Sequence, residues 1–162
     1  MTEVVSRGRL VILVTILVAY VLVVLPLPAW AQLARPEWVA LVLIYWCMAV
    51  PQRVGVGVAW LAGLGQDALQ AGLLGQQALA YALLAFVVLK LHQRVRVYPL
   101  GQQALIVLAL LSLVTLVQVW TNGLIDRPIS IHRYWLPPVV GMLLWPWLVV
   151  LLRAVRRYYG VR

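Results

Sequence analysis

Long apolar runs separated by short polar or basic segments dominate this chain. Six such runs occur, at residues 10–28, 38–50, 54–73, 74–91, 100–122 and 134–152. A helix needs about 20 apolar residues to cross a bilayer core of about 30 Å, so each run is interpreted as a transmembrane helix. The pattern predicts an all-α integral membrane protein, a bundle of six transmembrane helices. They form a single transmembrane domain over residues 1–162, with a basic cytoplasmic tail at 153–162.

Composition supports the same class of protein. Of the 162 residues, 65% are hydrophobic and only 10% are charged, whereas about 25% of a soluble domain is charged. The first run is long for a signal peptide and lacks a convincing small-residue cleavage site, so we expect it to be retained. The net charge of +9 does not indicate nucleic-acid binding, because the arginines flank apolar runs and form no basic face with interleaved aromatics.

Basic residues divide unequally between the two predicted sides of the membrane. One side collects ten: Arg7, Arg9, Arg53, Lys90, Arg94, Arg96, Arg153, Arg156, Arg157 and Arg162. The other side collects Arg35, Arg127 and Arg133. Because positively charged connections remain in the cytoplasm, both termini are expected there.

Asp67 is the one carboxylate inside a predicted span. Ala59, Gly63, Asp67 and Ala71 recur every four residues and share one helix face, with Gln66 and Gln70 beside it. A buried charge is costly in a membrane, so Asp67 is either a ligand or proton site or a hydrogen-bonded packing position. The packing interpretation is favoured, because no second acid and no base occurs at membrane depth; Lys90, at the end of its run, is counted with the cytoplasmic side. The small residues suit close contact with another helix.

A second polar stripe follows the run at 100–122, where Ser112, Thr115, Gln118 and Asn122 fall within one arc. Hydrogen bonds between helices explain it most simply, and a polar cavity is the alternative. Cys47 is the single cysteine, and His92 and His132 lie in connections on opposite sides. With no paired catalytic groups and no metal-ligand spacing, the sequence predicts neither an enzyme nor a cofactor.

Several short motifs occur in a characteristic order. They include Arg35-Pro36-Glu37-Trp38, Pro51-Gln52-Arg53, the glycines Gly72 and Gly75, and Trp145-Pro146-Trp147 before the basic tail. In this order and spacing the chain resembles the MreD family of rod shape-determining proteins, especially its proteobacterial branch. Ala71 departs from the pattern, since a small hydroxyl residue often precedes this glycine in the family.

The resemblance implies a fold similar to the six-helix substrate-binding subunits of energy-coupling-factor transporters. It also implies a non-enzymatic scaffold in the bacterial inner membrane, which helps maintain rod shape and organise side-wall peptidoglycan synthesis with MreC. MreB, RodA and the elongation transpeptidase would be indirect partners. The alternative is a small-molecule-binding membrane transport subunit, with Asp67 and the stripe at 112–122 lining a pocket open to the outside.

Overall fold

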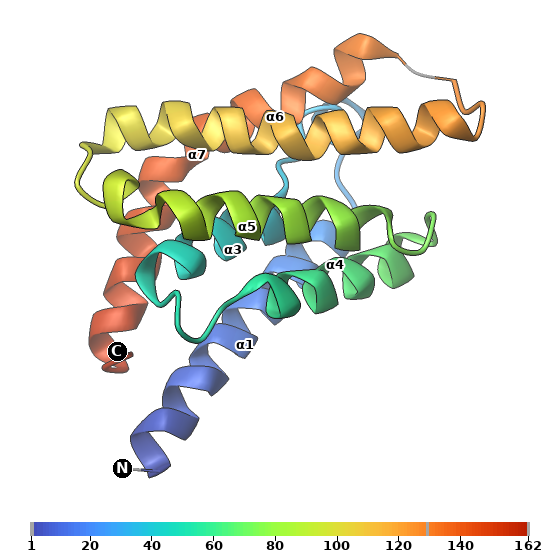
Figure 1. The fold of residues 1–162 in the computed structure, drawn as a ribbon. Helices are drawn as coiled ribbons and strands as arrows, with labels where there is room; N and C mark the ends of the chain where they lie inside the picture. Colours follow the sequence, from blue (N-terminus) through green and yellow to red (C-terminus); the bar gives the residue numbers. More distant parts are fainter. Residues whose placement is uncertain (1, 129, 162) are drawn as a thin grey trace.

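The computed structural model describes residues 2–128 and 130–161, and within them every regular element is a helix (Figure 1). In chain order these elements are α1 (Thr2–Val24), α2 (Ala29–Gln32), α3 (Trp38–Ala49), α4 (Val56–Gln70), α5 (Gln76–Val95), α6 (Leu100–Leu124) and α7 (Ile131–Tyr158). The described residues therefore support the all-α class.

Helix α3 forms the centre of the bundle. Ten of its 12 residues are buried, and it contacts α1, α5, α6 and α7. Trp46 is fully buried, and its indole Nε1 donates a hydrogen bond to Thr15 Oγ1 of α1 at 2.9 Å. A helix that is apolar on every side is stable only when other elements surround it, which explains why this short segment lies inside the bundle.

Small residues allow the outer helices to pack closely. A Cβ atom added to Gly65 of α4 would lie 2.7 Å from the hydroxyl oxygen of Tyr20, which donates a hydrogen bond to the carbonyl of Ala62. A Cβ atom added to Gly141 of α7 would lie 2.5 Å from a methyl group of Leu111 in α6. These glycines therefore set how closely α1 approaches α4 and α6 approaches α7.

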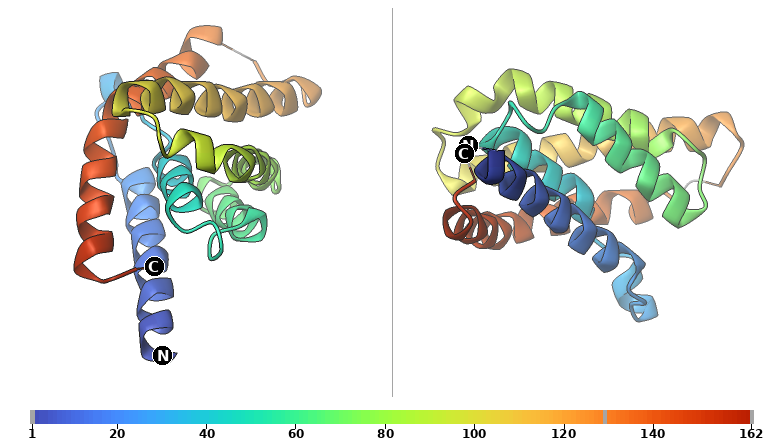
Figure 2. Two further views of the ribbon diagram at one scale, coloured as in Figure 1. Left: turned by 60° about the vertical axis from the view of Figure 1, so that its left-hand side comes forward. Right: turned by 90° about the horizontal axis from the view of Figure 1, so that it is seen from below.

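The chain reverses direction at each end of the bundle. Both termini and the α5–α6 connection lie at one end, whereas α2, the α4–α5 turn and the α6–α7 connection lie at the other (Figure 2, right). Helix α7 contains Pro137, Pro138 and Pro146 and is visibly bent (Figure 2, left). Proline removes a backbone hydrogen-bond donor and crowds the preceding turn, which accounts for the bend.

Within residues 2–128 and 130–161, four helices are long and apolar enough to cross a membrane: Ser6–Val24 within α1, and all of α5, α6 and α7. Helix α3 has 12 residues and α4 has 15, so at 1.5 Å per residue they span about 18 and 22 Å. Both are shorter than the bilayer core of about 30 Å. The structure thus supports an integral membrane protein, while six complete crossings stay a proposal.

The observed helices also extend past some expected bounds. Helix α1 begins at Thr2, α5 continues to Val95, and α7 continues to Tyr158, so that most of the predicted basic tail is helical. No proline or glycine interrupts the chain at 92–95 or at 153–158. Arg94, Arg156 and Arg157 lie in last helical turns, where positive charge interacts favourably with the helix dipole.

Candidate functional site

The carboxylate of Asp67 caps the beginning of the neighbouring helix. Its Oδ1 accepts a hydrogen bond from the backbone N–H of Gln77 at 3.0 Å, and its Oδ2 accepts from Gly75 at 2.9 Å and Ala78 at 3.4 Å. The first N–H groups of a helix lack partners within that helix. Their positive dipole end also favours a negative charge, so Asp67 fixes the start of α5 against the end of α4.

Gly63 lies where α4 comes closest to α5. A Cβ atom added there would be 2.4 Å from Ala78 Cα and 2.5 Å from both the Ala78 nitrogen and the Gln77 carbonyl oxygen. Ala59, one turn earlier, is fully buried on α4. Backbone therefore meets backbone along this face, as expected for small residues at a membrane helix interface.

Ala71 does not continue the Ala59, Gly63, Asp67 face. Helix α4 ends at Gln70, and Ala71 adopts the left-handed conformation with φ 48° and is exposed in the turn. The expected four-residue repeat thus stops at Asp67, because the chain must reverse to place α5 alongside α4. Of the two glutamines beside the face, Gln66 is buried and Gln70 is exposed.

Glu37 links three helices at the same end of the bundle. Its Oε1 accepts a hydrogen bond from Gln118 Nε2 of α6 at 3.2 Å, and its Oε2 lies 3.4 Å from Gln66 Nε2 of α4. The Tyr81 hydroxyl of α5 lies 3.1 Å from the same Oε2 and 2.7 Å from Gln66 Oε1, and can donate to one of them at a time. This carboxylate directly preceding α3 thus organises contacts among α4, α5 and α6.

Glu37 was not identified from the sequence as a candidate site residue, because it lies in a connection that precedes an apolar run. Two signals pointed to it: its place in the Arg35-Pro36-Glu37-Trp38 motif, and its position directly before Trp38, where acidic residues favour a helix start. Its partners are 29, 44 and 81 residues away in the chain. Helical periodicity carries no information about such distant pairings.

The predicted polar stripe on α6 divides into two parts. Ser112 Oγ donates to the Leu108 carbonyl at 2.7 Å and Thr115 Oγ1 to the Leu111 carbonyl at 3.1 Å, both within α6. The other two members reach different helices: Gln118 bonds Glu37, and Asn122 Nδ2 donates to the Tyr134 hydroxyl of α7 at 2.9 Å. Only the second part therefore belongs to the polar cluster around Glu37.

An open pocket of about 300 Å³ adjoins this cluster. Its lining is mostly amide side chains and comprises Glu37, Gln70, Gly72, Gln76, Gln77, Gln118, Asn122, Arg127 and Tyr134. The Gln77 Oε1 atom is buried and has no hydrogen-bond partner among the described residues. Within the same part of the chain, no group of three or more His, Cys, Asp or Glu residues is placed to hold a metal. The lining offers hydrogen bonds, and Asp67 lies outside it.

Shortening the Glu37 side chain should destabilise the junction of α4, α5 and α6. In Glu37→Ala, the amides of Gln66 and Gln118 lose their acceptor, while Tyr81 can still donate to Gln66. Each buried polar group left unpaired costs about 1–3 kcal/mol. We expect a clear drop in the unfolding temperature of the detergent-purified protein. Gln70→Ala removes an exposed amide from the same pocket and should leave that temperature nearly unchanged; equal losses would contradict the role of Glu37.

Two residues of the Arg35-Pro36-Glu37-Trp38 motif stabilise the end of α1 and the start of α3. The Arg35 guanidinium donates to the carbonyls of Val23 and, at 2.7 Å, Leu25, where α1 ends. Those last carbonyls lack partners within α1, and basic side chains commonly satisfy them. Buried Pro36 then precedes Trp38, the first residue of α3. Arg35 and Pro36 thus stabilise the turn from α1 into α3.

The remaining motif residues serve a turn and a helix face. Gly75 has φ 98°, a conformation that strains any side chain, and with Gly72 it forms the α4–α5 turn. On α7, Trp145 is fully buried while Trp147 is 78% exposed. Pro146 separates them, so this motif presents one indole to the core and one to the exterior.

Comparison with known proteins assigns the chain to a family. The family model described as "rod shape-determining protein MreD" matches residues 6–155. The chain belongs to the MreD family. It is also 30% identical over 140 residues to the rod shape-determining protein MreD of Haemophilus influenzae, and the aligned region covers 86% of each chain. The MreD resemblance seen in the sequence is thereby confirmed, and the protein is a rod shape-determining membrane protein.

No solved structure matches this MreD chain. The expected similarity to the substrate-binding subunits of energy-coupling-factor transporters therefore stays a prediction from the family resemblance.

Proposed function

We propose that this chain is a non-enzymatic scaffold of the cell-elongation machinery, which helps maintain rod shape and organises side-wall peptidoglycan synthesis through MreC. The match of the MreD family over residues 6–155 carries the proposal. MreC is the proposed direct partner, and MreB, RodA and the elongation transpeptidase are proposed to be reached through it.

The outer surface of the bundle suits binding to other membrane helices. Leu10, Leu13 and Leu17 of α1 are 51–61% exposed, and successive positions three or four apart lie on one helix face. In a membrane such a face contacts either lipid or a partner helix. A protein that presents apolar helix faces, and whose buried polar groups mainly join its own helices, is suited to assembly.

The proposed location is the bacterial inner membrane, with six crossings and both termini in the cytoplasm. Arg9 lies in the first turns of α1, Arg96 directly follows α5, and Arg153 lies toward the end of α7. These parts of the three helices are at the end of the bundle that has both termini (Figure 2, right). Positive charge favours retention of that end in the cytoplasm. Helix α3 is short, but surrounding helices cover it, and backbone shielded by protein is tolerated at membrane depth.

Partner recovery and cell shape together test the scaffold. In rod-shaped cells whose own MreD is depleted, expression of this chain should preserve rods, and a tag on it should recover MreC from solubilised membranes. A photoreactive residue placed in turn at Leu10, Leu13 and Leu17 would show whether the α1 face contacts MreC. Failure to recover MreC from cells that remain rod-shaped would contradict the proposal.

The second candidate is a small-molecule-binding membrane transport subunit, favoured by the open amide-lined pocket of about 300 Å³. Under this hypothesis a small polar ligand would copurify with the chain, and Gln118→Leu would abolish its binding. Depletion would then change solute uptake before cell shape. Rounded cells with unaltered uptake, and no bound small molecule, would decide for the scaffold.

A further inference from the structure

Three arginines surround a small pocket at the end of the bundle that has both termini. The pocket has a volume of about 110 Å³, and Arg96, Arg153 and Arg156 line it together with Tyr45 and Gln103. Arg96 directly follows α5, and the other two arginines lie in the last turns of α7. The pocket therefore forms where α3 and α5 end, α6 begins and α7 finishes.

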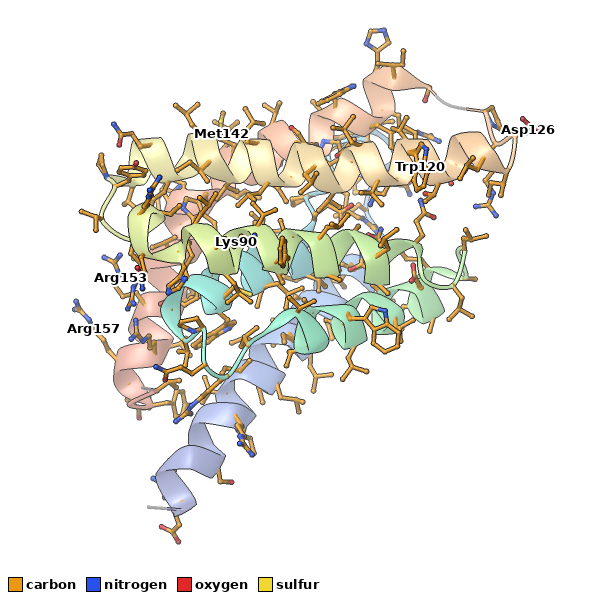
Figure 3. The ribbon with its side chains drawn as sticks, viewed as in Figure 1. Lys90, Trp120, Asp126, Met142, Arg153 and Arg157 are labelled. Atoms are coloured by element: carbon orange, nitrogen blue, oxygen red, sulfur yellow. The ribbon has the colours of Figure 1, made fainter. Side chains whose placement is uncertain are left out.

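Among the residues that the structure describes, no acidic side chain lines this pocket. The chain has four acidic residues. Two of them, Glu37 and Asp67, are engaged at the opposite end, and Asp126 lies there too, far from Arg153 and Arg157 (Figure 3). Glu3 is exposed near the start of α1 and is absent from the lining. Three neighbouring guanidinium groups repel one another, so an anion held among them would be stabilised.

A second hollow near the same end of the bundle is mainly apolar. It has a volume of about 370 Å³ between α1 and α7, and Leu10, Val11, Val14 and Val155 are in its lining. Val155 directly precedes Arg156, which lines the arginine pocket. Residues of α7 thus line both a hollow that suits an anionic group and a hollow that suits a hydrocarbon chain.

We propose that the pocket formed by Arg96, Arg153 and Arg156 binds the phosphate group of an anionic phospholipid. Guanidinium groups donate paired hydrogen bonds to phosphate oxygens, with geometry that an ammonium group does not match. Basic pockets between membrane helices on the cytoplasmic side bind lipid headgroups in this way. The apolar hollow that α7 also lines favours a lipid over a free phosphate ion as the occupant.

Matched charge variants of the full chain test the site. Arg96→Gln with Arg153→Gln removes two exposed pocket arginines and leaves Arg156, whose Nε donates to the Val161 carbonyl at 3.2 Å. Arg9→Gln with Arg94→Gln removes the same charge from exposed positions outside the pocket lining. Binding of dioleoylphosphatidylglycerol and dioleoylphosphatidylcholine to the detergent-purified proteins would be measured by native mass spectrometry.

The wild type should bind phosphatidylglycerol saturably and in preference to phosphatidylcholine. The pocket variant should bind phosphatidylglycerol with at least about tenfold lower affinity, because hydrogen bonds to charged groups are individually strong. The affinity of the control variant should stay within about twofold of the wild type, because solvent screens exposed surface charges. Equal losses in the two variants, or no loss in either, would overturn the proposal. Displacement of the lipid by millimolar inorganic phosphate would also overturn it, because the pocket would then be a free-anion site. The proposal would fail as well if the wild type bound neither lipid but recovered an acidic protein that the pocket variant did not recover.

A second measurement keeps the test decisive if the pocket variant does not fold. Phosphatidylglycerol should raise the unfolding temperature of the wild type and of the control variant, and phosphatidylcholine should raise it less. Equal stabilisation of the wild type by both lipids would overturn the proposal without use of the pocket variant.

Discussion

Replacing Gly63 with leucine should separate α4 from α5 and abolish a stable bundle. The position has no room even for a methyl group, because an added Cβ atom would lie 2.4 Å from Ala78 Cα, which is backbone and cannot rotate away. Overpacking a well-filled interface typically costs about 1–3 kcal/mol, and more where backbone must move. Gly63→Ala should therefore cost at least about 2 kcal/mol, although alanine is the better helix former.

Gly57 provides the matched control within the same helix. A Cβ atom added at Gly57 would meet nothing within 4 Å. Gly57→Ala should thus be neutral, or should stabilise by up to about 1 kcal/mol through helix propensity. Leu61 is 63% exposed, so Leu61→Phe should also be tolerated.

Thermal unfolding in detergent, membrane expression and rod-shape complementation would be compared for these variants. If Gly63→Leu unfolds, expresses and complements like Gly57→Ala, the close contact of α4 with α5 is not required.

Asp67→Leu should destabilise the α4–α5 pair nearly as strongly. It removes the acceptor of the backbone N–H groups of Gly75, Gln77 and Ala78. A buried donor left unpaired costs about 1–3 kcal/mol, and the substitution removes the acceptor of three donors. The favourable interaction between the carboxylate and the N-terminus of α5 disappears as well.

Asp67→Asn should give an intermediate result. Both carboxylate oxygens accept hydrogen bonds, so an asparagine must turn its NH₂ group toward at least one backbone N–H. Asparagine preserves size and one acceptor, and should retain part of the stability and part of the rod-shape function. The order Asp, then Asn, then Leu in unfolding temperature is the expected measurement.

A different order would identify a different role. If Asn and Leu unfold like the wild type but both fail to support rod shape, Asp67 contributes a proton or ligand contact instead of capping α5. Gln70→Leu, at an exposed position three residues later, serves as the control for added apolar bulk.

The sequence by itself determined the class of the protein, its family and the approximate location of its helices. Apolar runs and breaking residues are local properties, so the helices covering 38–50 and 100–122 appear close to their expected bounds as α3 and α6. The packing face of α4 could be predicted for the same reason, because helical spacing places Gly63 and Asp67 on one side of the helix. The MreD motifs are likewise stretches of adjacent residues.

Tertiary structure alone decided what those side chains contact. The periodicity of a helix gives the direction of a side chain relative to its own axis and does not identify the neighbouring helix. The Asp67 carboxylate meets backbone groups across a turn, and Glu37 meets a glutamine 81 residues away. The arginine pocket also depends on where helices separated in sequence end, as with Arg96 after α5 and Arg153 in α7. These positions follow from the packing of all helices around α3, which no single segment encodes.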